Sequence, residues 1–318
     1  MKLLISEMRA LSRYISREFY YTMTELIDVY GWKQIDTQEL WDEPGSFASR
    51  LERRFGEMPS VVLFWESYGF VISVLSELRK LRPLTCIFAD DLHWTSDTMR
   101  SQKLVSYLYS DVILAACEPV FDQFYPGLRR TKKIVWTPHA ASPDFFLPFH
   151  ENPPTAILLS GKIHAVYPLR KKMWTLYESG KYPIDVLEHP GYHCEYDYQS
   201  DSAVGARYAR EIHSRLCGFT CSLKYHYIVA KFFEIPATGS LLLADASVSE
   251  QLLKLGFFEY EHYVPVHGDQ LEAGIEFVLD SENRGIVDRI RRAGQQLVLE
   301  RHTTRDRARL IDRACSRE

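Results

Sequence analysis

The strongest constraint on the fold is a regular alternation of short apolar runs and amphipathic stretches along all 318 residues. The apolar runs of the first half are nearly continuous, which is typical of strands covered on both faces. They span 2–6, 60–65, 84–90, 111–116 and 132–139. Amphipathic segments separate them, at 12–31, 46–57, 69–81, 95–109 and about 118–125. This order predicts a parallel sheet with right-handed helical crossovers.

The same alternation resumes after a proline-rich stretch, 142–155, which has no periodicity and is the best candidate for a linker. Strands are expected at 155–162, 184–189, 240–245 and 263–266, and helices at about 168–179, 201–216, 224–235, 269–280 and 284–315, the last with a break near His302. The length is typical of two domains. We therefore expect two doubly wound α/β domains, at 1–145 and 146–302, and a terminal helix at 303–318 that packs back toward the first. Ligands of such sheets bind beyond the carboxyl ends of the strands, so a cleft is expected to hold the site.

Composition narrows the class of protein. A hydrophobic content of 46% argues against disorder, and 42 acids against 38 bases give no sign of a nucleic-acid partner. The apolar run at the N-terminus is too short for a signal peptide, and no window approaches a membrane span, so a soluble cytoplasmic protein is expected. The cysteines lack CxxC spacing and are expected to be buried free thiols, with half a zinc site at Cys217 and Cys221 as the alternative. They are Cys86, Cys117, Cys194, Cys217, Cys221 and Cys315.

The stretch KYHYIVAKFFEIPATGSLLLAD, 224–245, combines charges with an apolar pattern. On a helix over 224–235, Lys224, Tyr227, Lys231 and Glu234 share one arc of about 80°. Ser222 is the expected N-cap, Pro236 the stop, and Gly239 the left-handed turn before a buried strand. Two interpretations stay open: a solvated stripe with an ordinary Lys231–Glu234 pair, or a site for phosphate and sugar.

The segment KFFEIPATGSLLLAD resembles the donor-site segment of GT-B glycosyltransferases of the group-1 type, related to spore-maturation glycosyltransferases. SDVILAA with TPHAASPDFF, LLSGKIHAVYPLR and GQQLVLERHTTRDRARLI match further parts of that family in the same order. The resemblance covers most of 110–315 and is weak over 1–109. It implies two Rossmann-like domains facing a cleft, and transfer of a sugar from a nucleotide-diphosphate donor without a metal or cofactor.

The resemblance also implies roles for individual residues. Glu234 matches the carboxylate that holds the donor ribose, and lysines and glycines are expected around the diphosphate. The expected donor-site residues are Gly161, Lys162, Arg170, Tyr192, Lys224, Tyr225, His226, Lys231, Glu234 and Gly239. Retaining relatives often carry a glutamate eight residues before the one matching Glu234, where this chain has His226, so retention or inversion stays open.

Some of these positions have a structural alternative. Arg170 could be solvated surface, and Tyr192, in HPGYH, could belong to a plain turn rather than stack on the donor base. His139, beside the linker, is expected to face the donor sugar.

Residues of the first domain are candidates for the base that deprotonates the acceptor. Asp90, Asp91 and His93 follow a buried strand in ADDLHW, and Glu7 follows the first strand. The alternatives for ADDLHW are a helix N-cap arrangement and, less favoured, a metal site.

The tail from 284 to 318 carries ten arginines and five acids. It predicts a packed helix pair with an arginine-rich outer face, and peripheral contact with an anionic membrane is the alternative.

The sequence favours a glycosyltransferase acting on the hydroxyl of a glycan, a lipid-linked molecule or a small molecule. Its rivals are a nucleotide-sugar epimerase and a non-catalytic partner subunit. A dehydrogenase is disfavoured because KLLISEMRAL has no glycine after the first strand. The sequence leaves the donor, the acceptor, the catalytic base and the oligomeric state open.

Overall fold

The computed structural model of the chain describes residues 1–192, 196–201 and 203–316, so Cys194 lies outside the described residues. The chain divides into two compact units. Unit 1 comprises Met1–Ser12, Phe19–Pro138 and Arg305–Glu318, and unit 2 comprises Arg13–Glu18 and His139–Thr304. The sequence analysis put its boundaries at 145/146 and 302/303 and gave 13–18 to the first domain.

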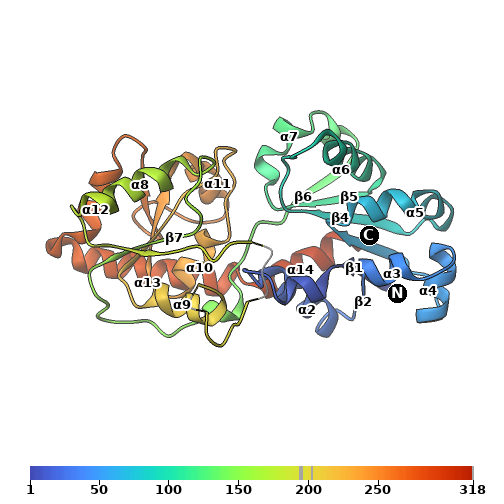
Figure 1. Cartoon of the computed structure of the whole chain (residues 1–318), viewed down its shortest axis with the longest axis horizontal. Coiled ribbons are helices and arrows are strands. Elements are labelled where there is room, and N and C mark those ends of the chain that lie inside the picture. Colours follow the sequence, from blue (N-terminus) through green and yellow to red (C-terminus); the bar gives the residue numbers. More distant parts are fainter. Residues whose placement is uncertain (193–195, 202, 317–318) are drawn as a thin grey trace. The chain divides into compact units, whose positions relative to one another are not determined.

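Unit 1 is built on a six-stranded parallel sheet in the order β2-β1-β3-β4-β5-β6. Its strands are β1 (Lys2–Ser6), β2 (Lys33–Asp36), β3 (Val61–Trp65), β4 (Leu84–Ala89), β5 (Val112–Ala115) and β6 (Lys133–Trp136). The apolar runs become these strands because helices cover both faces of the sheet (Figure 1). On one side lie α5 (Tyr68–Leu81) and α6 (Asp97–Tyr109), and on the other lie α2 (Glu18–Asp28) and α14 (Thr304–Ala314). The strand β2 was not predicted, because KQID contains a single apolar side chain.

The helices of unit 1 follow the expected amphipathic segments. They are α1 (Met8–Leu11), α2 (Glu18–Asp28), α3 (Thr37–Asp42), α4 (Phe47–Phe55), α5 (Tyr68–Leu81), α6 (Asp97–Tyr109), α7 (Phe121–Phe124) and α14 (Thr304–Ala314). The last helix packs against unit 1 through the carboxylate of Asp312. This carboxylate accepts hydrogen bonds from Lys2 Nζ at 2.6 Å and Trp32 Nε1 at 2.8 Å.

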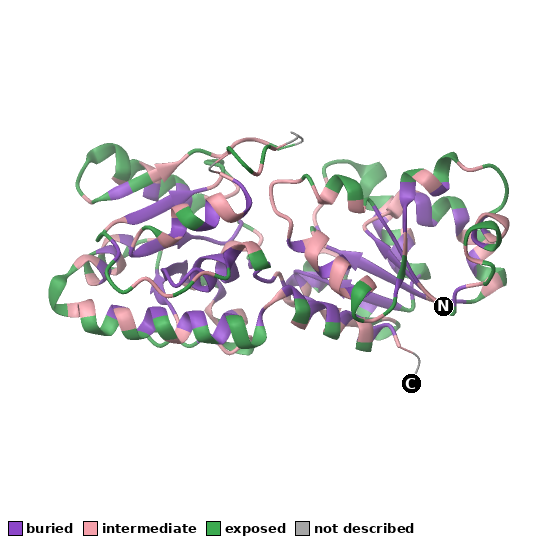
Figure 2. Cartoon of the chain, turned by 90° about the horizontal axis from the view of Figure 1, so that it is seen from below, coloured by how far each residue is buried: buried purple, intermediate pink, exposed green. Residues whose placement is uncertain are grey.

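Unit 2 contains a five-stranded parallel sheet in the order β11-β10-β9-β7-β8. Its strands are β7 (Ile157–Ser160), β8 (Ile184–Leu187), β9 (Cys217–Thr220), β10 (Leu241–Asp245) and β11 (Val264–Val266). Its helices are α8 (Pro168–Ser179), α9 (Gly205–His213), α10 (Lys231–Ala237), α11 (Ser249–Lys254), α12 (Leu271–Leu279) and α13 (Arg284–Arg301). The strands of this unit are buried (Figure 2), and the core that they form is apolar. The strand β9 was missed because CGFT is short and follows directly on an expected helix.

The strand order defines where a ligand is expected in unit 2. From β7 the chain first adds β8 on one side and then β9 on the other, so the order reverses between β7 and β9. Open α/β sheets bind ligands outside the carboxyl ends of the strands at such a point. In unit 2 that is the backbone that follows Ser160.

The helix predicted over 224–235 is wrong. The helix α10 begins at Lys231, and His226 has a left-handed backbone with φ of 60°, which a right-handed helix cannot contain. Ser222 is not an N-cap, because its backbone N–H and its hydroxyl both donate to the carboxylate of Asp245. Pro236 lies inside the last turn of α10, and Gly239 takes the expected left-handed turn, with φ of 81°.

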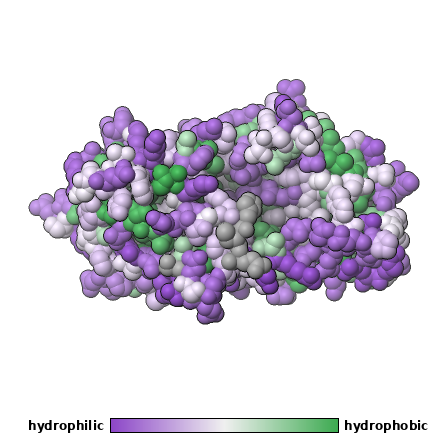
Figure 3. Space-filling model, viewed as in Figure 1, coloured by the Kyte–Doolittle hydropathy of each residue, from purple (hydrophilic) through white to green (hydrophobic). Residues whose placement is uncertain are grey.

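The arginine-rich tail forms the expected helix pair, α13 and α14, but its arginines do not all face outward. Arg291 and Arg307 are buried, and each donates to backbone carbonyls: Arg291 to Gly239 and His150, and Arg307 to Pro138. Buried guanidinium groups need such partners. In the part of the chain that the structure describes, every helix is too short or too polar to cross a bilayer. Hydrophilic side chains occupy much of the face seen in Figure 3.

Candidate functional site

A glycine shapes the backbone at the reversal point of unit 2. Gly161 follows β7 with φ of 95°, a conformation that side chains disfavour. A Cβ atom there would lie 3.1 Å from Arg170 Nη1 and 3.2 Å from Lys231 Cε. Glycine therefore lets two cationic side chains approach the end of the strand.

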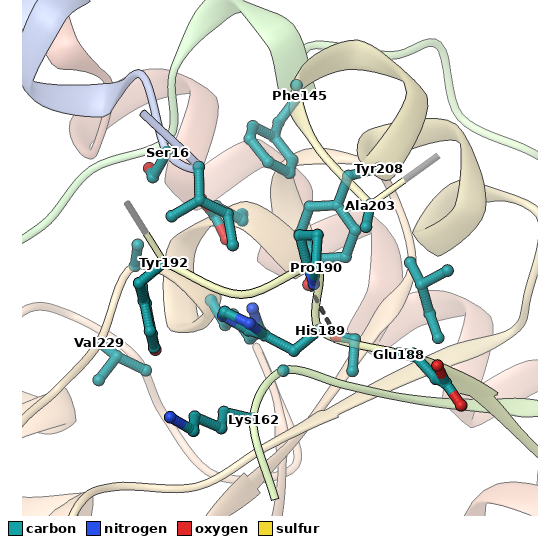
Figure 4. Close-up of a pocket in the computed structure, with 18 of the residues that line it drawn as sticks. Ser16, Phe145, Lys162, Glu188, His189, Pro190, Tyr192, Ala203, Tyr208 and Val229 are labelled. Atoms are coloured by element: carbon teal, nitrogen blue, oxygen red, sulfur yellow. Dashed lines mark hydrogen bonds between the residues drawn. The ribbon is translucent and has the colours of Figure 1, made fainter. Parts of the chain in front are cut away.

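A pocket of about 830 Å³, counting its open mouth, lies at this point, and every residue that lines it belongs to unit 2. Figure 4 shows Lys162 and Val229 at one end, Ser16 and Phe145 at the other, and His189 between them. The lining residues are Ile15, Ser16, Arg17, Asp144, Phe145, Ser160, Gly161, Lys162, Tyr167, Arg170, Leu187, Glu188, His189, Pro190, Tyr192, Ala203, Gly205, Tyr208, Val229, Ala230, Lys231 and Glu234.

Arg170, in the first turn of α8, is the most enclosed cation of the pocket, with an exposed fraction of 3%. Its Nη1 donates to Lys162 O at 3.0 Å, and its guanidinium carbon lies 3.9 Å from the centre of the Tyr167 ring. Its buried Nε–H has no hydrogen-bond partner among the described residues. A buried donor without a partner is unfavourable unless a ligand supplies an acceptor. Arg170 therefore provides a preformed contact for an anion.

Lys231 opens α10 and lies beside the same site. Its Nζ is 4.9 Å from the centre of the Tyr208 ring, and the hydroxyl of Tyr208 is 2.7 Å from Ser160 Oγ. Burial lowers the pKa of Lys231, but Tyr208 and the carboxylate of Glu234 outweigh burial, so its pKa is raised overall. The ammonium group therefore stays charged, close to Arg170.

His189 lies in the middle of the pocket as a neutral imidazole (Figure 4). Burial and the nearby cations Lys231, Arg170 and Lys162 lower its pKa to about 4. Its Nδ1 accepts the backbone N–H of Gly191 at 2.9 Å, so the proton of the neutral ring is on Nε2. His189 is therefore a hydrogen-bond donor through Nε2. The sequence analysis named its neighbour Tyr192 but not His189.

Glu234 supplies the buried carboxylate of the pocket, with an exposed fraction of 5%. Burial raises its pKa to about 7, opposed by Lys231 and His139 and reinforced by the carboxylates of Glu18 and Asp144. Among the described residues it has no hydrogen-bond donor as a partner. A carboxylate in this state is suited to accept hydrogen bonds from ligand hydroxyls.

The pocket combines buried cations with a carboxylate at the switch point of a parallel sheet. Two comparisons show what this chain is similar to. Residues 178–313 match the family described as glycosyl transferase-like. Sucrose-phosphate synthase from Thermosynechococcus elongatus has the same fold, with a TM-score of 0.63 and 9% identity over 98% of this chain and 97% of that one. The chain has the GT-B fold, and its residues 178–313 are glycosyl transferase-like.

Other solved structures share this fold at similar distance. HepE from Anabaena, in complex with UDP and glucose, gives a TM-score of 0.60 with 8% identity over 98% of each chain. An alpha-glucosyltransferase in complex with UDP-glucose and DNA gives 0.62 with 10% identity over 99% of each chain. No curated protein matches the sequence of this chain.

The structure brings together six of the expected donor-site residues. Gly161, Lys162, Arg170, Tyr192, Lys231 and Glu234 all line the pocket. Tyr192 is 38% exposed, with its ring 5.4 Å from Lys162 Nζ and 4.5 Å from the His189 ring. Arg170, for which solvated surface was the alternative, is buried.

Four other expected residues lie outside the pocket lining. Lys224 and Tyr225 contact each other, with Lys224 Nζ 5.0 Å from the ring, and His226 Nδ1 is 3.3 Å from Ser247 Oγ. The carbonyl of Gly239 accepts Arg291 Nε, and this glycine packs against Gln295 and Phe149.

His139 does not line the pocket either. Its Nδ1 pairs with Glu18 Oε2 at 2.8 Å, and Glu18 Oε1 accepts the backbone N–H of Ala140 at 2.7 Å. Arg17 forms a bidentate ion pair with Asp144, with contacts of 2.6 to 3.1 Å. The sequence analysis missed both pairs, since partners more than 120 residues apart leave no local pattern.

The candidate bases lie in unit 1. Glu7 follows β1, and partial burial raises its pKa despite a hydrogen bond from Thr37. Asp91 and His93 follow β4, and their backbone carbonyls accept hydrogen bonds from Lys103 Nζ. The side chains of the two residues lie close together, with His93 Nδ1 3.6 Å from Asp91 Oδ1. The backbone N–H of Asp90 donates to Glu66 Oε1 at 3.2 Å.

Glu66 was not singled out from the sequence. It follows β3 with φ of 53°, and burial together with the Asp90 carboxylate raises its pKa to about 8.

The cysteines of the described residues are free and buried: Cys86, Cys117, Cys217, Cys221 and Cys315. Burial raises the pKa of Cys221 to about 11, opposed by Arg170.

Proposed function

We propose that this glycosyltransferase transfers a sugar from a nucleotide-diphosphate donor, bound in the unit 2 pocket, to an acceptor hydroxyl. The observation that carries the proposal is the buried Arg170 guanidinium, whose Nε–H has no partner among the described residues, beside Lys231 and Lys162. Charged donors of this kind match the diffuse negative charge of a diphosphate.

The same residues account for leaving-group stabilisation. As the glycosidic bond to the diphosphate breaks, negative charge grows on the phosphate oxygens, and fixed cations stabilise it without reorganisation. His189 adds a neutral Nε2–H donor. We therefore propose that the reaction needs neither a bound metal nor a cofactor.

Glu234 is proposed to hold the ribose of the donor. Its ionised carboxylate has two acceptor oxygens, which suit a pair of adjacent hydroxyls. Burial raises the pKa of this carboxyl group to about 7. Hydrogen bonds donated by ligand hydroxyls would lower that pKa and so favour the charged form. Crystal structures of HepE and of the alpha-glucosyltransferase contain UDP-glucose, which makes UDP sugars the first donors to test.

The acceptor is proposed to be a hydroxyl of a glycan, a lipid-linked molecule or a small molecule. Asp90, Asp91, His93 and Glu7 remain the proposed bases for its deprotonation. Because the alpha-glucosyltransferase structures contain DNA, an acceptor panel should include duplex and modified DNA.

A thermal-shift screen with UDP, GDP, ADP and their glucose conjugates tests the donor site. A ligand at 100 times its Kd stabilises the folded protein by about 2.7 kcal/mol, which a melting curve resolves. Donors that stabilise are then incubated with the acceptor panel, and products are identified by mass spectrometry. Failure of every nucleotide to bind would overturn the proposal, and isomerised donor without transfer would indicate an epimerase instead.

A further inference from the structure

One short segment belongs to unit 2 although the sequence on both sides of it belongs to unit 1. The chain leaves unit 1 after Ser12, contributes Arg13–Glu18 to unit 2, and returns at Phe19. Three residues of the segment, Ile15, Ser16 and Arg17, line the pocket. We call Arg13–Glu18 the pocket strap.

The first anchor of the pocket strap is Arg17. Its guanidinium forms a bidentate ion pair with Asp144, with Nη2–Oδ1 at 2.6 Å and Nε–Oδ2 at 3.1 Å, and it stacks 4.2 Å from the centre of the Tyr198 ring. The Asp144 side chain is only 9% exposed. A bidentate, mostly enclosed pair fixes orientation as well as position.

The second anchor is the adjacent Glu18, which is 4% exposed. One oxygen accepts the Ala140 N–H, and the other pairs with His139 Nδ1, so both carboxylate oxygens are used. Gly205 closes the arrangement, because a Cβ there would lie 2.8 Å from the Tyr198 ring and 3.4 Å from Arg17 Nη2. The pocket strap is therefore held at two consecutive residues.

The pocket strap borders the end of the pocket that is distant from Lys162. Figure 4 shows Ser16 beside Phe145, across the pocket from Lys162. Glu18, its partner His139 and the Arg17 partner Asp144 are close enough to Glu234 to alter its pKa. Ile15 and Phe145 make this end partly apolar, and the charge of Arg17 there is paired with Asp144, whereas Lys162 lies at the opposite end.

We propose that the pocket strap forms the wall that receives the nucleoside of the donor, with Ile15 and Ser16 in contact with it and Arg17 and Glu18 as positioning residues. This inference rests on the proposed function, and in particular on Glu234 as the ribose ligand. An apolar wall next to a buried carboxylate suits a nucleoside, which presents a flat ring and a diol. Inorganic pyrophosphate would use the cationic end alone and would not sense the pocket strap.

The test compares nucleotide with pyrophosphate on the full chain. Calorimetry measures binding of UDP, GDP, ADP and inorganic pyrophosphate to wild type, Arg17→Met, Arg17→Lys and Ile15→Trp. The control is Lys181→Met, which removes an exposed ion pair with Glu272 elsewhere in unit 2. Arg17→Met is expected to weaken the best nucleotide about tenfold, or about 1.4 kcal/mol, and to leave pyrophosphate unchanged.

The other variants separate positioning from folding. Arg17→Lys keeps the charge without the bidentate geometry and should recover part of the affinity. Ile15→Trp fills the wall and should abolish nucleotide binding while pyrophosphate still binds. In turnover, Arg17→Met should raise KM for the donor with little change in kcat.

Two results would overturn the inference, and they differ from failure of the proposed function. Equal loss of nucleotide and pyrophosphate in Arg17→Met would mean that the ion pair only supports the fold. Unchanged nucleotide affinity in Ile15→Trp would mean that the nucleoside does not contact the pocket strap. If wild type binds pyrophosphate but no nucleotide, the proposed donor class itself is wrong.

Discussion

Two side chains with opposite departures from ordinary ionisation lie in one pocket, Glu234 with a pKa raised to about 7 and His189 with a pKa lowered to about 4. Burial is the largest cause for both, since a low dielectric disfavours either charge. Perturbed groups of this kind concentrate at functional sites. Both should respond when a polyanion with hydroxyl groups enters.

Replacing Glu234 with Gln should make stability less dependent on pH. A carboxyl group whose folded pKa is raised stabilises the fold below its unfolded pKa of about 4.5, and this contribution is lost as pH rises toward 7. Glu234→Gln should therefore have the same free energy of unfolding as wild type at pH 4.5. At pH 8 its free energy of unfolding should exceed that of wild type by at most about 3 kcal/mol. Melting curves across this range measure it, and identical pH profiles would contradict it.

Protonation of His189 should accompany binding of a diphosphate. The cations that lower its pKa are neutralised by the ligand, so the imidazole should take up a proton between pH 5 and 6. Calorimetry in two buffers of different ionisation enthalpy gives the number of protons. His189→Gln, which retains a donor in the place of Nε2, should bind with less uptake than wild type. Equal uptake in both proteins would assign the proton to another group.

At the scale of secondary-structure elements, continuous apolar runs in the sequence predict strands well, whereas segments with irregular backbone are predicted poorly. VVLFW and LLLAD became strands because only a sheet covered on both faces buries every side chain. The stretch 224–230 was misleading because Lys224 and Tyr227 continue the helix-like spacing of Lys231 and Glu234 while their own backbone is not helical. Its hydrogen bonds go elsewhere, such as from Lys224 N–H to Val166 O.

The start of α10 separates two lysines that looked equivalent in the sequence. Lys231 lines the pocket and Lys224 does not, so Lys231→Met should weaken UDP and pyrophosphate by about tenfold or more, since charge-assisted contacts contribute about 1.5–3 kcal/mol. Lys224→Met is the matched control and should bind both ligands as wild type does. Comparable losses in the two variants would mean that residues 224–230 contribute to the site after all.

The sequence predicted two parallel sheets apart from β2 and β9, the helix pair of the tail and six pocket residues, because these depend on local pattern or on the family resemblance. It could not predict the Arg17–Asp144 and Glu18–His139 pairs, because each joins residues more than 120 positions apart. Arg170 illustrates a middle case. Its place in YPLRKK suggested surface or ligand contact, and only the packing of Tyr167 and Lys162 around it shows that it is buried.

At the scale of the whole molecule, two units with separate sheets should respond separately to perturbation. Asp312→Ala removes the acceptor of Lys2 and Trp32 in unit 1, and loss of such a partner costs about 1–3 kcal/mol. Calorimetric unfolding should show a transition lowered by this variant and another raised by a bound nucleotide. A single transition moved by both changes would mean that the units unfold together.

The division of the chain also sets an order for its synthesis. Arg305–Glu318 belongs to unit 1 and emerges from the ribosome after all of unit 2, although β1 to β6 were made long before. Ile311 and Cys315, both buried, are added only after every strand of unit 1 has been made. The sheet of unit 1 therefore lacks one of its covering helices until α14 is made, and its apolar surface stays exposed for that time.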